Sequence, residues 1–398
     1  MGRVLILDGR QRSTLAATRS LGRAGHEVVV GEDAHPSLAS SSKYCASQFN
    51  YHSAIKEPLA FTDDLLNELN RQRYDLVLPM TDITTMLARR VVDQINQKSR
   101  LLIPTPENYD KAIDKGELIK LCKEIYVPVP ETIFINSPDD LESLKDKLTF
   151  PVVVKPRQSK YLLDDNWVET SVSYANSYEQ LVEKMTVWNS SLPYPMIQER
   201  IQGAGEGAFL LFSQGQCKAA FFHRRLREKP PSGGVSTLRE SAKPNELMRD
   251  YSVRLLEKLN WHGVAMVEFK YDNRDNLPKL MEINARFWGS LQLGIDAGID
   301  FPHLLFDLAM NQPIKELVNY KIGIRSRWFW GDVDSALIRL TKPVSKLNLP
   351  ENAPSKGKVL WEFIKLWQPK TMYEIMKLSD FGPFWNETKE WFRHVLKG

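Results

Sequence analysis

The chain has 398 residues, of which 42% are hydrophobic and 26% charged, which is ordinary for a soluble globular protein of two or three domains. Its formal net charge of +4 at pH 7 is too small for a typical nucleic-acid-binding protein, so no nucleic acid partner is expected. No apolar run reaches the roughly 18 residues that cross a bilayer, and three scattered cysteines argue against a disulfide framework or a zinc site and predict a cytoplasmic protein.

Residues 1–105 are predicted to form a small, doubly wound α/β domain. Strand sequences such as "RVLILDG" are continuously apolar, which is typical of parallel strands buried on both faces. The turn after the first strand lacks the glycine pattern of dinucleotide-binding domains, so a dinucleotide site is not expected there. The predicted elements are strands at 3–9, 26–33, 74–82 and 100–105 and helices at 13–25 and 83–95, the second helix capped by Thr81 or Asp82.

Residues 106–335 have the apolar runs and tight turns of an antiparallel sheet. The sequences "SQGQ" and "DNRDN" are typical hairpin turns, and each separates two apolar strands. We divide the region into a smaller unit at 106–200 and a larger one at 201–335, followed at 336–398 by a linker and an amphipathic helical tail rich in tryptophan and basic residues. The predicted strands lie at 150–156, 194–201, 207–228, 262–272 and 277–286, and the predicted helices at 107–125, 177–189 and 243–260.

Acidic and amide side chains gather on the last two of these strands. Glu268 lies on one strand, while Glu282 and Asn284 lie two residues apart on the next and so point to the same face. Paired carboxylates repel each other unless a cation neutralises them, and a few oxygen ligands suit Mg²⁺ that also binds phosphate. Each residue alone would be an ordinary solvated strand position. Together they predict a magnesium site, with Arg286 binding an anion beside it.

The order and spacing of four motifs resemble the ATP-grasp superfamily. The motifs are "PVVVKP", "QERIQGAGEG", "VEFKYD" and "MEINARFWGSLQLGIDAGIDFPHLL", and the resemblance extends over residues 104–312. It implies an N-terminal doubly wound α/β domain, then α+β ATP-grasp domains, and finally a helical C-terminal tail. In that scheme residues 106–200 are the small subdomain with a phosphate lid, and residues 201–335 carry the metal site.

The resemblance implies a nucleotide-binding role for residues of both subdomains. Lys115 and Lys155 match the two lysines that reach the phosphates of ATP, the second one near the α-phosphate and the adenine. Glu199, with the main chain of Arg200 and Ile201, resembles the interdomain hinge that reads the adenine edge. ATP is therefore the expected nucleotide.

The metal ligands and the ribose contact follow from the same resemblance. Glu206 matches the acid that holds the ribose hydroxyls, and Arg286 matches the arginine near the γ-phosphate or the acyl intermediate. The ligands that match those of magnesium, or of manganese in its place, are Glu268, Glu282 and Asn284.

The resemblance implies an ATP- and magnesium-dependent ligase that joins a small carboxylate to an amine, in a biosynthetic or cell-envelope pathway. The chemistry supports it, because a carboxylate oxygen is a poor leaving group until phosphoryl transfer converts it to an acylphosphate. Such transfer depends mainly on positioning and charge neutralisation. Two alternatives remain open: a ligase with a non-amine acceptor, such as a thiol or bicarbonate, and a nucleotide-binding module without turnover. The intact set of metal ligands argues against the second.

Two segments depart from the superfamily pattern. The loop at 157–171 should cover the phosphates, but it contains none of the glycines that are frequent there, so Lys160 or the backbone would replace them. Tyr126 stands where glycine is usual, and a non-glycine residue in a left-handed cap costs roughly 1 kcal/mol.

A basic strand with a glycine-containing loop is the candidate substrate side of the site. Arg225 and Arg227 are predicted to share one face, and Arg227, Lys229 or the loop at 232–234 is expected to contact phosphate or the acceptor carboxylate. Arg227 and Lys229 are accordingly placed with Arg286 as catalytic candidates. The simpler interpretation is an exposed basic hairpin edge.

The tail combines tryptophan with lysine, as amphipathic helices at a membrane interface do. It is expected to bind a membrane surface or a protein, or to pack on its own domain. The resemblance adds the expectation of a homodimer.

Overall fold

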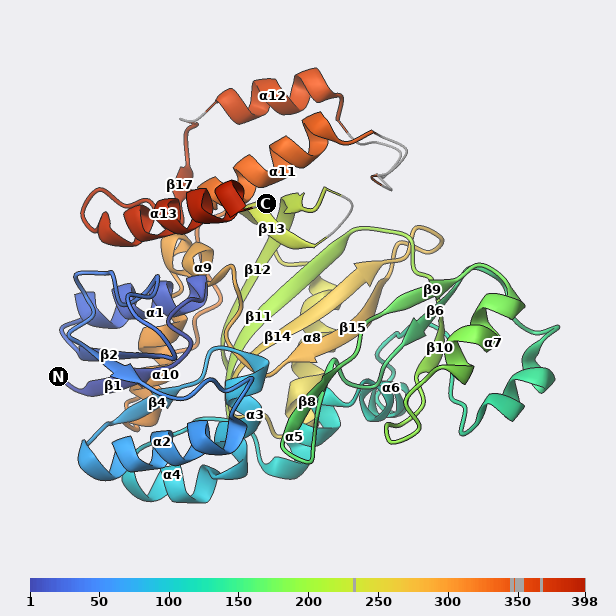
Figure 1. Cartoon of the computed structure of the whole chain (residues 1–398), viewed down its shortest axis with the longest axis horizontal. Helices are drawn as coiled ribbons and strands as arrows, with labels where there is room; N and C mark the ends of the chain where they lie inside the picture. The colour runs from blue at the N-terminus through green and yellow to red at the C-terminus, as the bar shows by residue number, and fades with distance from the viewer. Residues whose placement is uncertain (232–233, 344–346, 348–353, 366–367, 398) are drawn as a thin grey trace.

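The computed structural model describes residues 1–231, 234–343, 347, 354–365 and 368–397 (Figure 1). Within these residues the strands form a parallel four-stranded sheet, an antiparallel four-stranded sheet, a seven-stranded sheet and a two-stranded hairpin. The parallel sheet belongs to the N-terminal part of the chain. The other sheets build the region that carries the predicted site.

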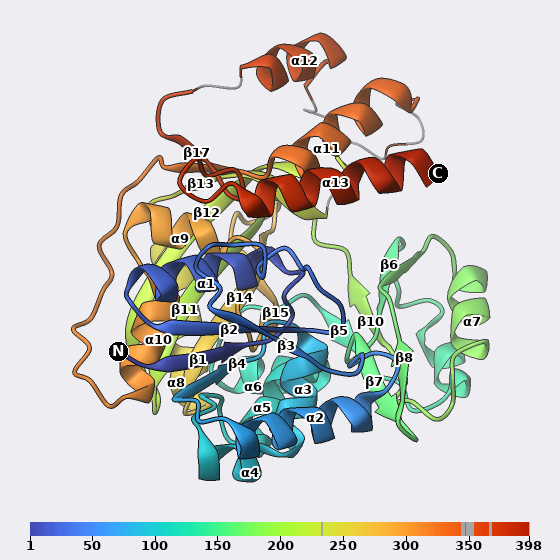
Figure 2. The same ribbon diagram turned by 60° about the vertical axis from the view of Figure 1, so that its left-hand side comes forward.

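The N-terminal sheet has the strand order β3-β2-β1-β4, with all neighbours parallel. Successive side chains of its strands point alternately into two apolar clusters. Val4 and Ile6 pack with α1, while Leu5 and Leu7 pack with α2 to α4 on the other face. Helices therefore cover both faces of the sheet, as Figure 2 shows. The elements are β1 (Arg3–Ile6), α1 (Arg12–Arg23), β2 (Glu27–Glu32), β3 (Ser47–Asn50), α2 (Pro58–Arg71), β4 (Leu76–Leu78), α3 (Asp82–Arg90) and α4 (Val92–Lys98).

Two predictions for this part were wrong. The helix predicted at 83–95 is divided into α3 and α4, because Val91 leaves helical geometry with φ −119° and ψ 24°. Residues 100–105 form no strand, since only the Arg100 carbonyl accepts a hydrogen bond from strand β4, at Val77. Thr81 caps α3, and its hydroxyl accepts a hydrogen bond from the Thr84 N–H.

The helix predicted at 107–125 is also two helices, α5 (Pro106–Ile113) and α6 (Lys115–Glu124). The break lies at Asp114, whose carboxylate accepts hydrogen bonds from the N–H groups of Gly116 and Glu117 and so caps a new helix. This break makes Lys115 the first residue of α6. Tyr126 has φ +56°, the left-handed conformation expected for that position.

The small subdomain is an antiparallel sheet with the order β5-β10-β6-β9 and a separate hairpin, β7-β8. The hairpin corresponds to the glycine-free loop, and its tip residues Asp164 and Asp165 have positive φ angles of 44° and 60°. The Trp167 indole donates a 2.9 Å hydrogen bond to the carbonyl of Ala54, which holds the hairpin against the N-terminal domain. The elements are β5 (Thr132–Ile133), η1 (Pro138–Leu144), β6 (Val152–Lys155), β7 (Lys160–Leu163), β8 (Asn166–Glu169), β9 (Ser173–Ala175), α7 (Tyr178–Thr186) and β10 (Met196–Glu199).

The seven-stranded sheet has the order β15-β14-β11-β12-β13-β16-β17. Helix α8 covers one face, and α9, α10 and helix α1 of the N-terminal domain cover the other. The turn at Gln214 and Gly215 joins β11 to β12, and residues 272–277 join β14 to β15, as predicted. The elements are β11 (Gly205–Ser213), β12 (Gln216–Lys229), β13 (Val235–Ser241), α8 (Glu246–Lys258), β14 (Gly263–Tyr271), β15 (Pro278–Asn284), α9 (Leu291–Ala297), α10 (Phe301–Ala309) and β16 (Arg325–Arg327).

The tail contains α11 (Phe329–Thr341), α12 (Lys356–Ile364), β17 (Thr371–Tyr373) and α13 (Gly382–Lys397). It is not wholly helical, because β17 pairs in parallel with β16 and extends the large sheet. The boundary predicted between 335 and 336 falls inside α11, because the apolar face of this helix continues across that position. Trp330 of α11 stacks on Trp391 of α13 at 4.2 Å between ring centroids, so the tail packs on its own protein.

Candidate nucleotide and metal site

The predicted metal ligands come together at the end of two neighbouring strands. Glu268 on β14 lies directly opposite Glu282 on β15 in the antiparallel register. The Asn284 amide donates a 3.2 Å hydrogen bond to Glu268 Oε1, which ties the third candidate to the first. The Glu268 and Glu282 side chains are 26% and 32% exposed, so both remain partly accessible.

The two carboxylates repel each other within a set of cations. Burial raises the pKa of the Glu268 carboxyl, and the negative charge of Glu282 raises it further, while Arg225 and Arg286 oppose the rise. Arg225 NH2 lies 3.3 Å from Glu268 Oε2, and Lys115 Nζ lies 3.4 Å from Glu282 Oε2. Each carboxylate therefore has one cation within ion-pair distance, and the pair together attracts further positive charge.

Arg286 adjoins this pair but binds an acid of the N-terminal domain. Its Nε and NH2 groups donate to the two oxygens of Asp82, at 2.8 and 3.0 Å, in a bidentate arrangement. The same NH2 group lies 3.3 Å from Asn284 Oδ1. Asp82 is the first residue of α3, so this contact joins the N-terminal domain to the candidate metal ligands.

The two predicted phosphate lysines point toward the same region. Lys155 is 5% exposed at the end of β6, and its Nζ donates to the Met281 carbonyl at 2.9 Å. Burial lowers the pKa of Lys155 to about 8, an effect to which Lys115 adds and which Glu282 opposes. Lys115 begins α6 and contacts Ser159 at 3.5 Å, so the small subdomain supplies both lysines to the site.

A small cavity of about 80 Å³ lies where these elements meet. Its lining includes Asp82 from the N-terminal domain, Lys115 and Lys160 from the small subdomain, and Glu282 and Asn284 from the large sheet. Lys160, expected to replace the missing glycines of the lid, lines this cavity and pairs with Glu169 across the hairpin. The cavity therefore lies between the lid and the candidate metal ligands.

The candidate hinge follows β10. Glu199 Oε1 accepts from the Glu131 N–H at 2.9 Å, and its Oε2 accepts from Arg274 NH2 at 2.6 Å. Ile201 is buried, and the Arg200 guanidinium lies over a tyrosine ring of β9. The Glu199 carboxylate thus joins the small subdomain to the β14–β15 turn.

Glu206 is placed apart from the metal candidates. Its register partners are Arg224 and Phe269, whereas Gly207 pairs with Glu268. Because side chains alternate along a strand, Glu206 points to the opposite face of the sheet from Glu268 at this level. Burial raises the pKa of Glu206, and no ion pair of Glu206 occurs among the described residues.

Arg227 and Lys229 are not brought to the metal candidates. The register between β12 and β13 shifts on both sides of Arg227, and Arg225 and Arg227, which were predicted to share one face, have different partners, Glu268 and Asp332. Arg227 NH2 lies 3.0 Å from Asp332 of α11, and Lys229 pairs with Asp334 of the same helix. Residues 232 and 233 of the predicted contact loop lie outside the described residues.

Three charged partners in the site were not expected from the sequence: Asp82, Arg225 and Arg274. Arg225 was noted only as a neighbour of Arg227, and Asp82 only as a candidate helix cap. Each contacts a site residue between 43 and 204 positions away in the chain. The charge of Asp82 at the start of a helix was the available signal for a functional role, but the neighbouring sequence does not indicate that Arg286 is its partner.

The donor set fits a hard divalent cation. Two facing carboxylates and an amide supply oxygen ligands, and a bound cation would relieve the repulsion between the two carboxylates. A group of three His, Cys, Asp or Glu side chains arranged to hold a metal does not occur in the described part of the chain. Oxygens from a bound phosphate would complete the coordination, as magnesium sites at nucleotides commonly require.

Known proteins resemble this chain in sequence and fold. Residues 213–331 match the family "ATP-grasp in the biosynthetic pathway with Ter operon". The carbamoyl phosphate synthase large chain, C-terminal section, of Methanopyrus kandleri is 22% identical over 71% of this chain. The chain spans about half (55%) of that relative's length.

Solved structures show the same architecture. A biotin carboxylase complex with β,γ-ATP from Campylobacter jejuni has a TM-score of 0.65 at 14% identity, covering 81% of this chain and 74% of the other. An L-amino acid ligase from Bacillus licheniformis has a TM-score of 0.59 at 16% identity, with 79% and 75% covered. The ATP-grasp resemblance found in the sequence is confirmed by the family match at residues 213–331 and by the shared fold.

Proposed function

We propose that the chain is an ATP- and Mg²⁺-dependent ligase that activates a small carboxylate as an acylphosphate and joins it to an amine. The observation that carries the proposal is the facing pair Glu268 and Glu282, bonded to Asn284 and flanked by Lys115 and Arg286. Carboxylates, an amide and cations from both subdomains meet there, as the binding of a magnesium-bound nucleoside triphosphate would require. The similarity to an ATP-bound biotin carboxylase fold supports it.

The protein's own residues would bind the nucleotide and balance its charge. Lys115 and Lys155 would bind the phosphates, Glu199 and the following main chain the adenine edge, and Glu206 the ribose. The opposite-facing placement of Glu206 requires the ribose contact to form at the strand end, where β11 begins. Bound Mg²⁺ would supply Lewis-acid neutralisation of the phosphate charge, held by Glu268, Glu282 and Asn284.

The first chemical step transfers the γ-phosphoryl group. A carboxylate oxygen of the substrate forms a bond to the γ-phosphorus while the bond to the β,γ-bridging oxygen breaks, and ADP leaves with that electron pair. Arg286, fixed by Asp82, would stabilise the negative charge spread over the transferring group. Lys155 would keep its proton and neutralise the phosphate oxygens.

The second step forms the amide bond. The amine lone pair attacks the acyl carbon, the bond from carbon to the phosphate oxygen breaks, and the amine loses its proton. The β7–β8 hairpin would exclude water from the acylphosphate, since the Trp167 contact already holds the hairpin against the N-terminal domain. Hydrolysis would otherwise waste the intermediate.

The two alternatives differ from this proposal in what they release. A ligase with a non-amine acceptor would release ADP with a thiol or another nucleophile, and a silent module would release none. ADP release measured over a panel of carboxylates crossed with amines and thiols, with mass spectrometry of the products, separates the three. An amide product with ADP supports the proposal, and binding of Mg-ATP without turnover under all combinations would overturn it.

Glu282→Gln tests the metal set directly. We expect magnesium-dependent ADP release to fall at least about 100-fold, or roughly 2.7 kcal/mol in activation free energy, because one of the two facing carboxylates loses its charge. Glu257→Gln, on the exposed side of α8, is the matched control and should retain the activity. An active Glu282→Gln enzyme with unchanged magnesium dependence would contradict the assignment.

A homodimer remains part of the proposal. Sedimentation equilibrium of the full chain, with and without Mg-ADP, tests it. A monomer at all concentrations would contradict it.

A further inference from the structure

A second arginine, Arg225 on β12, lies against the candidate metal pair. Its NH2 group is 3.3 Å from Glu268 Oε2, and its NH1 group donates to Glu228 Oε1 at 3.2 Å. Both distances are long for charge-assisted hydrogen bonds, which are typically about 2.7–2.9 Å. The side chain is 25% exposed. An anionic ligand at a shorter distance would therefore compete with either carboxylate for this guanidinium.

Arg225 also has more free donors than Arg286, since a guanidinium carries five N–H groups. Arg286 donates to Asp82 through Nε and NH2. Its NH2 group also donates to Asn284 and its NH1 group to the Phe287 carbonyl, which leaves one N–H on NH1. Arg225 makes one hydrogen bond from each terminal nitrogen, so its Nε–H and one hydrogen on each of NH1 and NH2 have no partner among the described residues. The donors that a planar carboxylate needs are therefore available on Arg225.

The strand order places Arg225 across the metal pair from the two predicted phosphate lysines. Lys115 and Lys155 both contact residues of β15. Glu268 follows on β14, and β11 and then β12 with Arg225 come next in the sheet (Figure 1). In phosphoryl transfer the attacking and leaving oxygens lie roughly in line on opposite sides of the phosphorus. Because the lysines would hold the nucleotide phosphates on the β15 side, the attacking carboxylate would lie on the β12 side.

A glycine of the intervening strand leaves the sheet uncovered beside Arg225. The register of β11 with β12 puts Gly205 level with Arg225, and its register with β14 puts Gly205 opposite Lys270. Within 4 Å, a Cβ at Gly205 would meet only the Phe269 carbonyl oxygen, at 3.9 Å. No side chain of β11 therefore fills the position between the two cations.

The charge around Arg225 favours an anion. Lys270 is half-buried and has neither an ion pair nor a hydrogen bond among the described residues. Its charged neighbours are the cations Arg200 and Arg225 and the anion Glu228. Bound magnesium would neutralise Glu268 and leave the cations in excess. A carboxylate would relieve their repulsion, whereas a substrate ammonium would add to it.

We propose that Arg225 binds the substrate carboxylate that attacks ATP, on the side of the metal pair opposite the nucleotide phosphates. The assignment rests on the proposed ligase function. Arg225 binds the oxygen that does not attack, while the other oxygen forms the bond to the γ-phosphorus and ADP leaves with the electron pair of the broken bond. Magnesium at Glu268 weakens the contact between Glu268 and Arg225 and so frees the NH2 group for the substrate.

Arg225 also acts in the amide-forming step. After phosphoryl transfer, the oxygen bound to Arg225 is the carbonyl oxygen of the acylphosphate. Attack by the amine lone pair places a negative charge on this oxygen, and the N–H groups of Arg225 stabilise that charge. The carbonyl bond re-forms as the bond from carbon to the phosphate oxygen breaks, and the amine proton passes to solvent. One guanidinium thus orients the nucleophile of the first step and stabilises the oxyanion of the second.

Hydroxylamine trapping tests the assignment, because hydroxylamine converts acylphosphates to hydroxamates. The full chain with Mg-ATP is assayed with acetate, succinate and the twenty common amino acids, and the acid that gives the most hydroxamate is used for the variants. Arg225→Gln should lower kcat/KM for this acid at least about tenfold, because a hydrogen bond between charged groups is lost. The KM for Mg-ATP should change less than about twofold. Arg225→Lys keeps the charge without the planar pair of donors and should lie between Arg225→Gln and the wild type.

Isothermal titration calorimetry measures binding without turnover, with the same acid titrated into the enzyme saturated with Mg-AMPPCP. In Arg225→Gln the Kd for the acid should rise at least about tenfold. The Kd for Mg-ADP should stay within about twofold of the wild-type value, which also shows that the variant is folded. Arg249→Gln is the matched control, because Arg249 pairs with Glu316 and lies on α8, which covers the other face of the sheet.

Three outcomes would contradict these assignments. Equal kcat/KM and Kd for the acid in Arg225→Gln and the wild type overturn the role of Arg225 and leave the ligase function standing. Loss of Mg-ADP binding in Arg225→Gln, matching the loss of acid binding, would make Arg225 part of the nucleotide site and also overturn that role. Absence of hydroxamate from the wild type with every acid refutes the ligase function itself.

Discussion

Lys155 is a buried cation whose charge depends on pH in an accessible range. Burial lowers its pKa from 10.5 to about 8 in the folded protein, so it is protonated and able to bind phosphate at pH 7 and mostly neutral at pH 9. The unfolded chain keeps this proton to a higher pH than the folded protein does. The free-energy cost of burying the Lys155 charge is therefore fully present below pH 8 and is relieved as the pH rises from 8 to 10.5. Nucleotide binding should instead weaken as the pH rises, because neutral Lys155 attracts phosphate less than the charged form does.

We therefore expect the Kd for Mg-ADP to rise by up to about tenfold between pH 7 and pH 9. If only protonated Lys155 binds phosphate, its fraction falls about tenfold at one pH unit above the pKa. Isothermal titration calorimetry at both pH values measures the change. Lys155→Arg keeps its charge throughout and should remove most of the pH dependence. A wild-type Kd that is equal at pH 7 and 9 would show that Lys155 is not a phosphate ligand.

Asp82 fixes the direction of Arg286 without itself belonging to the ATP-grasp subdomains. Asp82→Asn leaves Arg286 with one hydrogen-bond acceptor in place of a bidentate carboxylate. We expect kcat to fall about tenfold, roughly 1.4 kcal/mol, while the KM for Mg-ATP changes less than twofold, because the loss is confined to the transferring group. Asp93→Asn, exposed on α4, is the control. A rise in KM at constant kcat would instead make Asp82 part of nucleotide binding.

At the scale of elements, alternation and hairpin spacing were sufficient to place the metal candidates. The turn at 272–277 brings β14 against β15, and the period of two puts Glu282 and Asn284 on one face, so local sequence determines this part of the site. The position of Arg227 depends on a register shift between β12 and β13, which has no composition signal. Its partner Asp332 lies on α11, and pairing over such a distance follows from tertiary packing alone.

The helix boundaries were also predictable only in part from local sequence. A continuous apolar period predicted one helix at 107–125, yet Asp114 caps a second helix and places Lys115 at its start. An aspartate such as Asp114 within a periodic apolar sequence is a weak signal for a helix break, because aspartate is also tolerated inside a continuous helix. Strand β17 was missed for a different reason. It has three residues and is stabilised by pairing with β16, which the tail sequence does not reveal.

Segment 371–380 is an integral element of the fold. The Arg19 guanidinium of α1 is 1% exposed, pairs with Asp380 at 2.7 Å and donates to three main-chain carbonyls of that segment. Asp380→Ala leaves a buried charge without its acid, and we expect it to lower the free energy of unfolding by about 3–5 kcal/mol. Chemical denaturation measures this. Asp275→Ala removes an exposed pair with Lys279 and should cost under about 1 kcal/mol; equal losses for the two variants would contradict the structural role.

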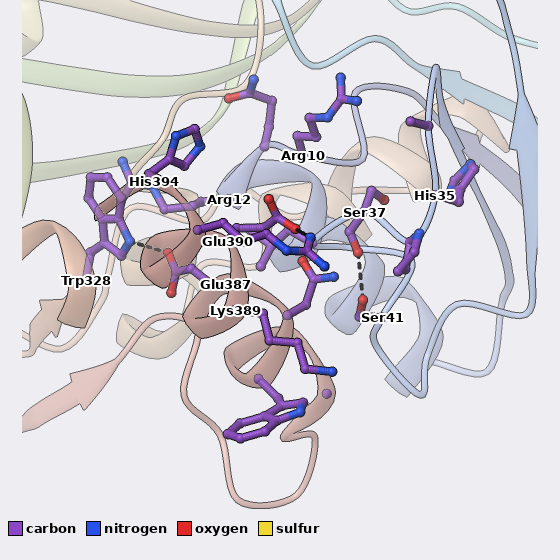
Figure 3. A pocket seen from close by; sticks show the side chains of 18 of the residues that line it. Arg10, Arg12, His35, Ser37, Ser41, Trp328, Glu387, Lys389, Glu390 and His394 are labelled. Carbon is purple, nitrogen blue, oxygen red and sulfur yellow. Dashed lines mark hydrogen bonds and ion pairs between the residues drawn. The ribbon is translucent and has the colours of Figure 1, made fainter. Parts of the chain in front are cut away.

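At the scale of the whole molecule, the tail closes one side of the protein. Helix α13 packs on α11 and on the N-terminal domain, while α12 stands at the outer edge (Figure 1). No helix in the described part of the chain is long and apolar enough to cross a bilayer. Trp367 of the tail lies outside the described residues. Helix α13 also forms one wall of the cavity of about 900 Å³ that Figure 3 shows.

Helix α12 has no buried residue, and it exposes Trp361 and Ile364 by 61% and 59% beside Lys365. Apolar and basic side chains on an uncovered helix suit the interface of an anionic membrane. We propose that α12 binds such a surface, and we expect the full chain to co-sediment with phosphatidylglycerol vesicles at low salt and to dissociate as salt rises.

Trp361→Ser combined with Ile364→Ser should weaken vesicle binding about tenfold, or roughly 1.4 kcal/mol, because it removes the two apolar side chains that would enter the interface. Leu378→Ser, which removes a 91% exposed leucine outside α12, is the matched control and should bind as the wild type does. Neutral phosphatidylcholine vesicles test the contribution of charge, and binding to them should be weaker. If the wild type stays in the supernatant with phosphatidylglycerol at low salt, α12 does not bind membranes, and the ligase chemistry, which uses none of its residues, is unaffected.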